Sequence, residues 1–272
     1  MKAAYNFVTN VDGFTPQNLV HMCLDYFDQE SRGYDDFDAG TTKRRLYCDA
    51  IDRLVIERLA RLESPCRVVS FGCGTGRREV KIAAALATPA ELTGIENAPG
   101  MMARAAQRGI RTAPSLDALD DSPPDRMSAA LCLWSFGHLP TVELRLATLS
   151  GLFRLLRDDG VLLLDVFNLH DRHEWGTHLL DAGLGERRDV IYGKAGRRAT
   201  AYVHYFSLGE ISVLAERAGF VVETVRAVGY GQHPGRLDVP WDEGSLFLVC
   251  RKPRQSTERK APPVSTPEQT ET

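Results

Sequence analysis

A glycine-rich turn and an acidic residue carry the clearest chemical signal in the chain. The apolar segment at residues 68–71 runs directly into the turn Gly72-Cys73-Gly74-Thr75-Gly76, and Glu96 follows the next apolar segment. Glycines at alternate positions leave the peptide bare and permit positive φ angles, so a ligand can lie against the backbone. A glutamate at the tip of the second strand offers two acceptor oxygens to a ribose diol. The pattern predicts a nucleoside-bearing cofactor at the carboxyl edge of a parallel sheet.

The residue after the turn separates two kinds of cofactor. Dinucleotide-binding proteins place a third glycine one position later, where it lets the helix pack on the strand and approach a pyrophosphate. Here residue 77 is Arg. The turn is therefore less typical of a nicotinamide enzyme than of a protein that binds a single nucleoside.

Five segments, in order, resemble class I S-adenosylmethionine-dependent methyltransferases. Residues 72–76 are similar to the first motif of that family, and residues 92–105 resemble the second, an acidic residue followed by a Met- and Ala-rich helix. Residues 129–140 resemble its fourth strand and the following loop, residues 155–166 its fifth strand, and residues 215–222 its Ala-Gly-Phe junction into strand six. The resemblance covers residues 60–252 and implies an S-adenosylmethionine-dependent methyltransferase with a Rossmann-like, doubly wound, seven-stranded α/β fold.

The resemblance also implies which residues contact the cofactor, S-adenosylmethionine. The turn and the segment that starts at Glu96 form two of the contact regions, and the tip of the fourth strand adds an aromatic face that could stabilise the sulfonium. Asp117 corresponds to an acidic residue that touches the adenine amino group in family members. The predicted cofactor-binding residues are Gly72, Cys73, Gly74, Gly76, Glu96, Asn97, Met101, Asp117, Trp134, Ser135 and Phe136.

Three residues are candidates for catalysis or for contact with the acceptor. The sulfonium is already electrophilic, so the enzyme mainly aligns a nucleophile and excludes water. His138, in the loop after the fourth predicted strand, is placed to act as a general base. Asn168, at the tip of the fifth predicted strand, could bind substrate. Tyr34 belongs to a Tyr-Asp pair that in family members often folds over the cofactor or substrate. A structural role is the alternative for His138 and for Tyr34.

The surrounding elements alternate in the way that a parallel sheet requires. Residues 1–63 are predicted to be a helical lid segment, with apolar stretches at residues 19–27 and 46–62 and a loop at residues 31–42. Residues 64–252 are predicted to form the S-adenosylmethionine-binding domain. Residues 253–272 carry almost no apolar side chain and are predicted to be a disordered tail. Strands are predicted at residues 67–71, 91–95, 110–113, 129–134, 161–167, 220–228 and 245–251, and the resemblance implies that the last is antiparallel.

A long insert at residues 168–206 is expected to be a substrate cap, since long inserts in compact folds tend to be lids or binding loops. Residues 188–192 and 199–205 alternate in character around a glycine-containing turn, which predicts a hairpin. The hairpin could cover the substrate pocket with Tyr202, His204 or Tyr205, for each of which ordinary sheet packing is the alternative.

No metal site is predicted. His170, His173 and His178 lie near Asp165 and Asp171 in the sequence, but their spacing does not place two ligands on one helical face with a third nearby. The six cysteines include no Cys-x-x-Cys pair, so the sequence implies neither zinc nor disulfides.

Composition favours a cytoplasmic enzyme with a small-molecule substrate. The chain has 272 residues and 43% hydrophobic content, enough for a sizeable core. No apolar segment approaches the roughly 20 residues that cross a bilayer, and the N-terminus lacks an apolar signal core. The formal net charge is −3, whereas nucleic-acid-binding domains are usually basic. We therefore expect no membrane or nucleic-acid partner; the sequence does not predict an oligomeric state.

Several functions stay open at the level of sequence. The favoured one is methyl transfer to oxygen, nitrogen or carbon of a small molecule, with release of S-adenosylhomocysteine. A tRNA methyltransferase is the second, because residues 202–211 resemble a segment of wobble-uridine tRNA enzymes. A third is intramolecular displacement of methylthioadenosine from S-adenosylmethionine to form azetidine-2-carboxylate, since the same cofactor motifs would serve it. A cofactor-binding subunit without catalysis is a fourth, which the intact motifs disfavour.

Overall fold

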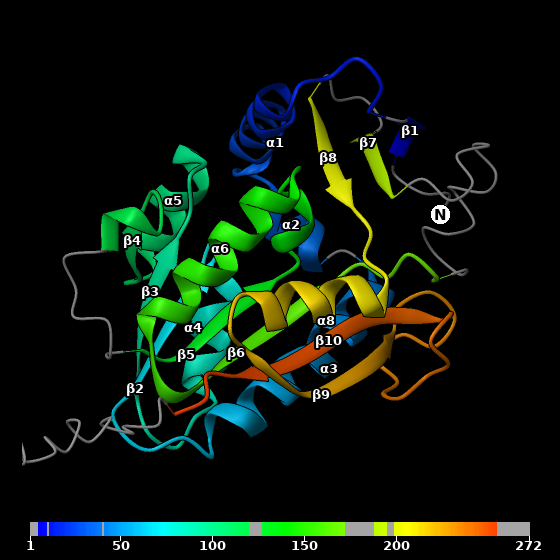
Figure 1. Ribbon diagram of the computed structural model, residues 1–272. Coiled ribbons are helices and arrows are strands. Elements are labelled where there is room, and N and C mark those ends of the chain that lie inside the picture. The colour runs from blue at the N-terminus through cyan, green and yellow to red at the C-terminus, as the bar shows by residue number, and fades with distance from the viewer. Residues whose placement is uncertain are drawn as a thin grey trace, which may run out of the picture.

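A seven-stranded sheet with the order β4-β3-β2-β5-β6-β10-β9 forms the centre of the computed structural model, which describes residues 5–9, 11–39, 41–119, 127–171, 188–194 and 199–254 (Figure 1). Strands β2 to β6 pair in parallel, and β10 lies antiparallel between β6 and β9. The predicted doubly wound sheet and its antiparallel last strand are thus confirmed. Its strands are β2 (Cys66–Phe71), β3 (Ala90–Ile95), β4 (Arg111–Ala113), β5 (Met127–Leu133), β6 (Leu156–Val166), β9 (Val221–Gly229) and β10 (Gly244–Arg251).

Helices cover both faces of this sheet. α6 (Val142–Leu155) and α8 (Leu208–Arg217) pack on one face, and α3 (Thr42–Leu59) and α4 (Arg77–Ala84) on the other (Figure 1). β5 is buried at every position, as expected for a central parallel strand with both faces covered. α5 (Pro99–Gln107) contacts β4, and a single 3-10 turn, η1 (Asp117–Leu119), follows β4.

The N-terminal segment is mostly helical, with two differences from the sequence prediction. α1 (Pro16–Glu30) and α3 confirm the two predicted helices, and Thr15 caps α1 in a capping box with Asn18. However, β1 (Tyr5–Thr9) is a strand, because it pairs with a strand more than a hundred residues away, a contact that local periodicity does not reveal. The predicted loop at residues 31–42 contains the short helix α2 (Tyr34–Ala39).

A second sheet, with the order β1-β7-β8, lies with α1 over one end of the main sheet (Figure 1). Its strands β7 (Asp189–Lys194) and β8 (Thr200–His204) pair antiparallel, which confirms the predicted hairpin. α1 packs on this sheet through Leu19, Cys23 and Tyr26. Residues 172–187 and 195–198 of the predicted cap, which include His173 and His178, lie outside the described residues, as does the predicted tail from residue 255 onward.

Two observations bear on membranes and metals. No helix of the described segments combines the length and apolarity needed to span a bilayer. Across those same segments, no three His, Cys, Asp or Glu side chains come together in a way that would hold a metal ion. All six cysteines are buried free thiols.

Candidate active site

The turn between β2 and α4 presents bare backbone. The N–H of Gly72 donates to the carbonyl of Ile95 at the end of β3 (2.7 Å), which ties the turn to the neighbouring strand. Gly72, Gly74 and Gly76 have φ angles of 67°, 56° and 73°, which glycine adopts without steric cost. A Cβ on Gly72 would meet Cβ of Ser135 at 2.3 Å, whereas one on Gly74 would meet nothing within 4 Å. Gly74 therefore borders open space that any side chain at this position would fill.

Glu96 fixes this turn through its carboxylate. Oε2 accepts the N–H of Gly74 (2.9 Å), and Oε1 accepts the N–H groups of Asn97 (3.0 Å) and Ala98 (2.9 Å). Burial raises the pKa of Glu96, and the three backbone hydrogen bonds oppose that rise. A carboxylate has about four acceptor sites, so Oε2 retains one for the hydroxyl of a ligand.

A cavity of about 450 Å³ lies beside the turn, between the tips of β2, β3 and β5, α1 and the second sheet. One side of it is formed by the glycine turn and Glu96. The other side is aromatic, with rings from α1, α2, the tips of β5 and β6, and β7. Ten of the residues predicted from the sequence line it: Tyr34, Gly72, Gly74, Glu96, Asn97, Met101, Asp117, Trp134, Ser135 and His138.

Three of the predicted cofactor residues lie outside this lining and pack into the protein. The sulfur of Cys73 fills the space in front of Gly94, where an added Cβ would meet it at 2.4 Å. A Cβ on Gly76 would meet Ile110 and, in α5, Ala105, so Gly76 faces these residues instead of the cavity. Phe136 is fully buried and stacks on Phe206 (5.5 Å between ring centroids). Sequence spacing identified the segments that surround the cavity, but not which of their side chains face the protein core.

Asn168, predicted to bind substrate, also lies outside the lining. Its Nδ2 donates to the carbonyls of Trp241 (2.5 Å) and Gly244 (2.8 Å), and its Oδ1 accepts the N–H of His170 (3.0 Å). The amide thus anchors the loop before β10. These bonds occupy both ends of the amide, so the structure gives Asn168 a structural role and no contact with the cavity.

Trp134, at the tip of β5, belongs to an aromatic stack beside the cavity. Its φ of 62° is unusual for a residue with a side chain and persists only where the surroundings enforce it. The indole stacks on Tyr47 (5.0 Å, 9°) and on Phe167 (5.9 Å, 16°), and the guanidinium of Arg44 lies 4.7 Å from its centroid. Trp134, Phe167 and Arg44 all line the cavity.

His138 has the geometry of a general base. It ends the short turn η3 (Phe136–His138), and its Nδ1 lies 2.6 Å from the carbonyl oxygen of Tyr202 on β8. A carbonyl only accepts, so Nδ1 carries the proton and Nε2 of the neutral ring is an acceptor. No described residue donates to Nε2, and the ring of Phe27 packs edge-on at 4.9 Å. Burial lowers the pKa of His138, against the opposing effect of the Tyr202 carbonyl, so the ring is neutral near pH 7.

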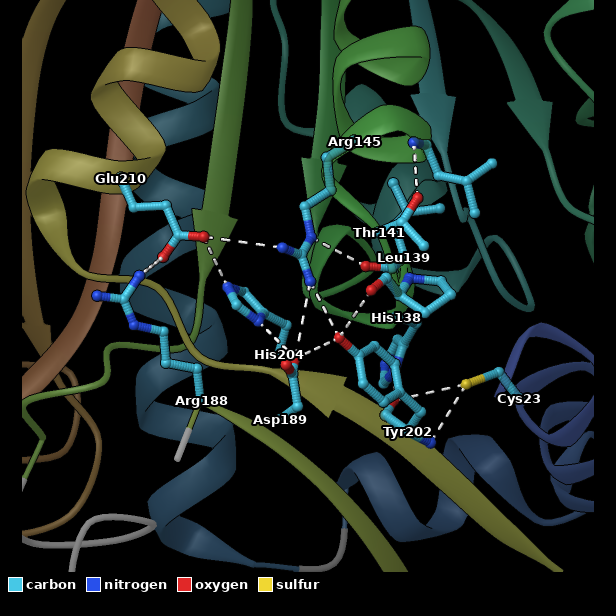
Figure 2. A network of polar contacts seen from close by, with 12 residues as sticks. Cys23, His138, Leu139, Thr141, Arg145, Arg188, Asp189, Tyr202, His204 and Glu210 are labelled. Carbon is cyan, nitrogen blue, oxygen red and sulfur yellow. Dashed lines mark hydrogen bonds and ion pairs between the residues drawn. The ribbon is translucent and has the colours of Figure 1, made fainter. Parts of the chain in front are cut away.

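A polar cluster holds the two backbone segments next to His138 (Figure 2). We call Arg145, Asp189, Tyr202, His204 and Glu210 the charged cluster. The Tyr202 hydroxyl donates to Asp189 (2.5 Å) and accepts from Arg145 (2.9 Å). Nε of Arg145 donates to the carbonyl of the residue after His138, Leu139 (2.9 Å). Arg145 therefore connects the loop that carries His138 to the strand that orients its ring.

His204 links the two carboxylates of the charged cluster. Its Nδ1 lies 2.7 Å from Asp189 and its Nε2 2.9 Å from Glu210 (Figure 2). The ring therefore lies within hydrogen-bonding distance of both carboxylates. Burial alone raises the pKa values of Asp189 and Glu210, but the bonds from His204 and the charge of Arg145 bring both below their ordinary range.

Sequence reasoning missed Arg145 and assigned the hairpin residues only in part. Arg145 lies on the buried stripe of α6 with Leu149 and Leu152, and a charge on an apolar stripe is the signal that could have identified it. In the hairpin, side chains alternate between faces. Tyr202 and His204 point into the charged cluster, while Val203 between them lines the cavity.

The side of the cavity near the turn fits a nucleoside-bearing cofactor. Gly74 leaves room for a ligand against the backbone, and Oε2 of Glu96 has an acceptor site for a ribose hydroxyl. The open space at Gly74 and the remaining acceptor site of Glu96 are both observed in the structure of this chain.

Comparisons with known proteins agree with this assignment. Residues 40–225 match a family model described as a methyltransferase domain. The chain is also similar to an uncharacterized methyltransferase of Emericella nidulans, with 29% identity over 182 residues. That match covers 59% of this chain and 58% of the relative, so it spans little more than half the length of the relative.

Several solved structures of similar fold are methyltransferases as well. The 1,6-didemethyltoxoflavin-N1-methyltransferase of Burkholderia thailandensis, solved with 1,6-didemethyltoxoflavin and S-adenosylhomocysteine, has a TM-score of 0.64 and 17% identity, covering 93% of this chain and 100% of that one. The CcbJ methyltransferase of Streptomyces caelestis has a TM-score of 0.62 and 16% identity, covering 86% and 99%. At such identities these structures establish the fold. The family match over residues 40–225 shows that the chain belongs to the S-adenosylmethionine-dependent methyltransferases, so S-adenosylmethionine is its cofactor.

Proposed function

We propose that the protein methylates a small aromatic molecule at an O–H or N–H group, and that Nε2 of His138 accepts the proton of that group. The observation that carries the proposal is the 2.6 Å contact between Nδ1 of His138 and the Tyr202 carbonyl, which leaves Nε2 as the acceptor in a ring that lines the cavity. Its lowered pKa keeps the ring neutral near pH 7, the state in which it can take a proton.

The aromatic wall supports a planar acceptor. Rings bury large apolar areas and prefer stacked or edge-on partners. The B. thailandensis enzyme of similar fold binds a small molecule, 1,6-didemethyltoxoflavin, which supports a small-molecule acceptor here. The formal charge of −3 disfavours a nucleic-acid substrate. The aromatic residues of the wall are Tyr26, Phe27, Tyr34, Trp134, Phe167, Tyr192 and Tyr230.

The chemistry divides between the cofactor and the protein. When bound, S-adenosylmethionine supplies an electrophilic methyl group. The glycine turn and Glu96 orient the nucleoside, Trp134 and Phe27 exclude water from the acceptor, and His138 takes up the acceptor proton.

Turnover with a panel of phenols and N-heteroaromatics tests this proposal. S-adenosylhomocysteine release should depend on an acceptor, and His138→Gln should lower kcat by about 10²- to 10⁴-fold. The affinity of the variant for S-adenosylhomocysteine should match that of the wild type. His170→Gln, which replaces an exposed histidine outside the cavity, is the matched control and should leave kcat unchanged. Methylthioadenosine release without an acceptor, or methylation of tRNA that falls steeply with salt, would contradict the proposal.

A further inference from the structure

Asp35 on α2 connects the N-terminal segment to the cofactor side of the cavity, although it does not line the cavity itself. Its Oδ1 accepts the hydroxyl proton of Thr75, inside the glycine turn (2.6 Å). Its Oδ2 accepts from Arg104 on α5 (2.7 Å) and from Arg108 just after α5 (2.6 Å). Burial raises the pKa of Asp35, but these hydrogen bonds and the two arginine charges lower it below the ordinary range, so the carboxylate is ionised.

Contacts from the end of α1 reinforce this connection. Oδ1 of Asp28 accepts the N–H of Gly100 in the first turn of α5 (2.6 Å), and Nη1 of Arg104 donates to the carbonyls of Ser31 (3.0 Å) and Arg32 (2.8 Å). A Cβ on Gly100 would meet Oγ of Ser31 at 2.3 Å, so the two segments touch directly. The junction of α1 and α2 is therefore fixed to the helix that follows Glu96 and to the turn that Glu96 holds.

Another face of the same segment forms part of the aromatic wall of the cavity. Phe27 on α1 and Tyr34 at the start of α2 line the cavity, and their rings contact each other edge-on at 6.4 Å. Phe27 also packs against His138 (4.9 Å). One short stretch of chain thus contacts the cofactor turn on one side and the candidate base on the other.

We infer that Asp35 is a positioning residue that couples cofactor binding to the placement of Phe27 and Tyr34 over the acceptor. A ligand that fixes the glycine turn fixes the Thr75 hydroxyl, which favours the contact with Asp35. By reciprocity, the contact must favour the turn conformation that binds the ligand. The inference rests on the proposed function only for the identity of the acceptor side, because the coupling is measurable with S-adenosylhomocysteine alone.

The test compares Asp35→Asn with Asp36→Asn. Both remove one negative charge from α2, but Asp36 is exposed. Calorimetry with S-adenosylhomocysteine should show affinity at least about fivefold weaker for Asp35→Asn, and unchanged within twofold for Asp36→Asn. Asp35→Glu, which keeps the charge, should recover part of the loss. Equal affinity of the wild type and Asp35→Asn would overturn the inference.

Hydrogen exchange separates coupling from a purely structural role. In the wild type, S-adenosylhomocysteine should slow exchange in residues 15–39, and in Asp35→Asn this protection should be lost while protection of residues 92–105 remains.

Thr75→Val removes the other partner of the same hydrogen bond and serves if Asp35→Asn does not fold. The double variant Asp35→Asn/Thr75→Val should lose no more affinity than the worse single variant, because both substitutions break the same hydrogen bond between Thr75 and Asp35. Additive losses, or intact protection of residues 15–39, would contradict the coupling. A wild-type-like kcat in His138→Gln would instead contradict the proposed function and leave these binding results standing.

Discussion

The two sides of the cavity are built in different ways. On the cofactor side, backbone groups of the glycine turn and of residues 96–98 meet one carboxylate, and the partners Gly74 and Glu96 are 22 residues apart. On the acceptor side, side chains from α1, α2, η3 and the second sheet meet, and the partners His138 and Tyr202 are 64 residues apart. The first side depends on a local motif and the second on tertiary packing. Changes on the cofactor side should therefore alter cofactor affinity, and changes on the acceptor side should alter stability and turnover.

The largest effect is expected from Arg145→Met. Arg145 is only 3% exposed, and its loss removes the donor to the Leu139 carbonyl and to the Tyr202 hydroxyl as well as a cation shared by Asp189 and Glu210. A buried polar group left without its partner costs about 1–3 kcal/mol, so the two groups together cost roughly 2–6 kcal/mol. We expect a decrease of that size in the free energy of unfolding, measured by denaturant titration.

Arg188→Met is the matched control for this prediction. Arg188 pairs with the same Glu210 (2.9 Å) but is half exposed, so its removal should cost about 0–1 kcal/mol. Equal losses in both variants would mean that the charged cluster does not hold the acceptor side together.

Glu96→Gln should have the next largest effect, this time on cofactor affinity. Both carboxylate oxygens accept backbone N–H groups, so an amide of the same shape must turn its NH₂ toward at least one of those donors. Loss of charge-assisted hydrogen bonds should weaken binding of S-adenosylhomocysteine by about 1–3 kcal/mol, measured by calorimetry. Glu91→Gln, at an exposed position on β3, the strand that precedes Glu96, should bind normally. Unchanged affinity in Glu96→Gln would remove the glutamate from the cofactor site.

The contrast between the two sides also explains what the sequence could predict. The seven strands and the glycine turn were predictable because their signals are local: continuous apolar runs, alternating glycines and an acidic residue at the next strand tip. His138 was recognisable as a candidate from its position after the fourth strand of the sheet. Its tautomer was not, because that depends on the Tyr202 carbonyl, which only the fold brings near.

Other features needed the fold as well. β1 forms because β7 offers a pairing edge, and α2 is held by the contacts of Asp35 rather than by its own short sequence. Asn168 stands at a strand tip, as predicted, but position along a strand does not say where an amide points. Its bonds to Trp241 and Gly244 come from a loop that follows more than seventy residues later.

Gly74→Ala tests whether bare backbone matters for the cofactor. Gly74 and Gly13 both have positive φ and no atom within 4 Å of an added Cβ, but only Gly74 lines the cavity. Alanine at either position should cost about 1–2 kcal/mol of stability from backbone strain. Only Gly74→Ala should also weaken binding of S-adenosylhomocysteine, by about tenfold or 1.4 kcal/mol, because its methyl group occupies the space for the ligand. Equal binding by both variants would show that the ligand does not approach Gly74.

The smallest expected effect is a shift in the pH profile of kcat. Burial lowers the pKa of His138, so the protonated ring is disfavoured in the folded protein. The base is active when neutral, and kcat should therefore persist below the ordinary histidine value of about 6.5 and fall only at lower pH. The free energy of unfolding should also decrease as the pH falls through the folded-state pKa, since protonation of this ring favours the unfolded chain.

Phe27→Ala exposes the ring to water and should move the acid limb upward toward about 6.5. Phe14→Ala, which removes an exposed ring from the same N-terminal segment, should leave the limb in place. An acid limb that does not move in Phe27→Ala would mean that residues other than Phe27, such as the carbonyl-bearing strand β8, keep water from His138, and that the acceptor side is closed without α1.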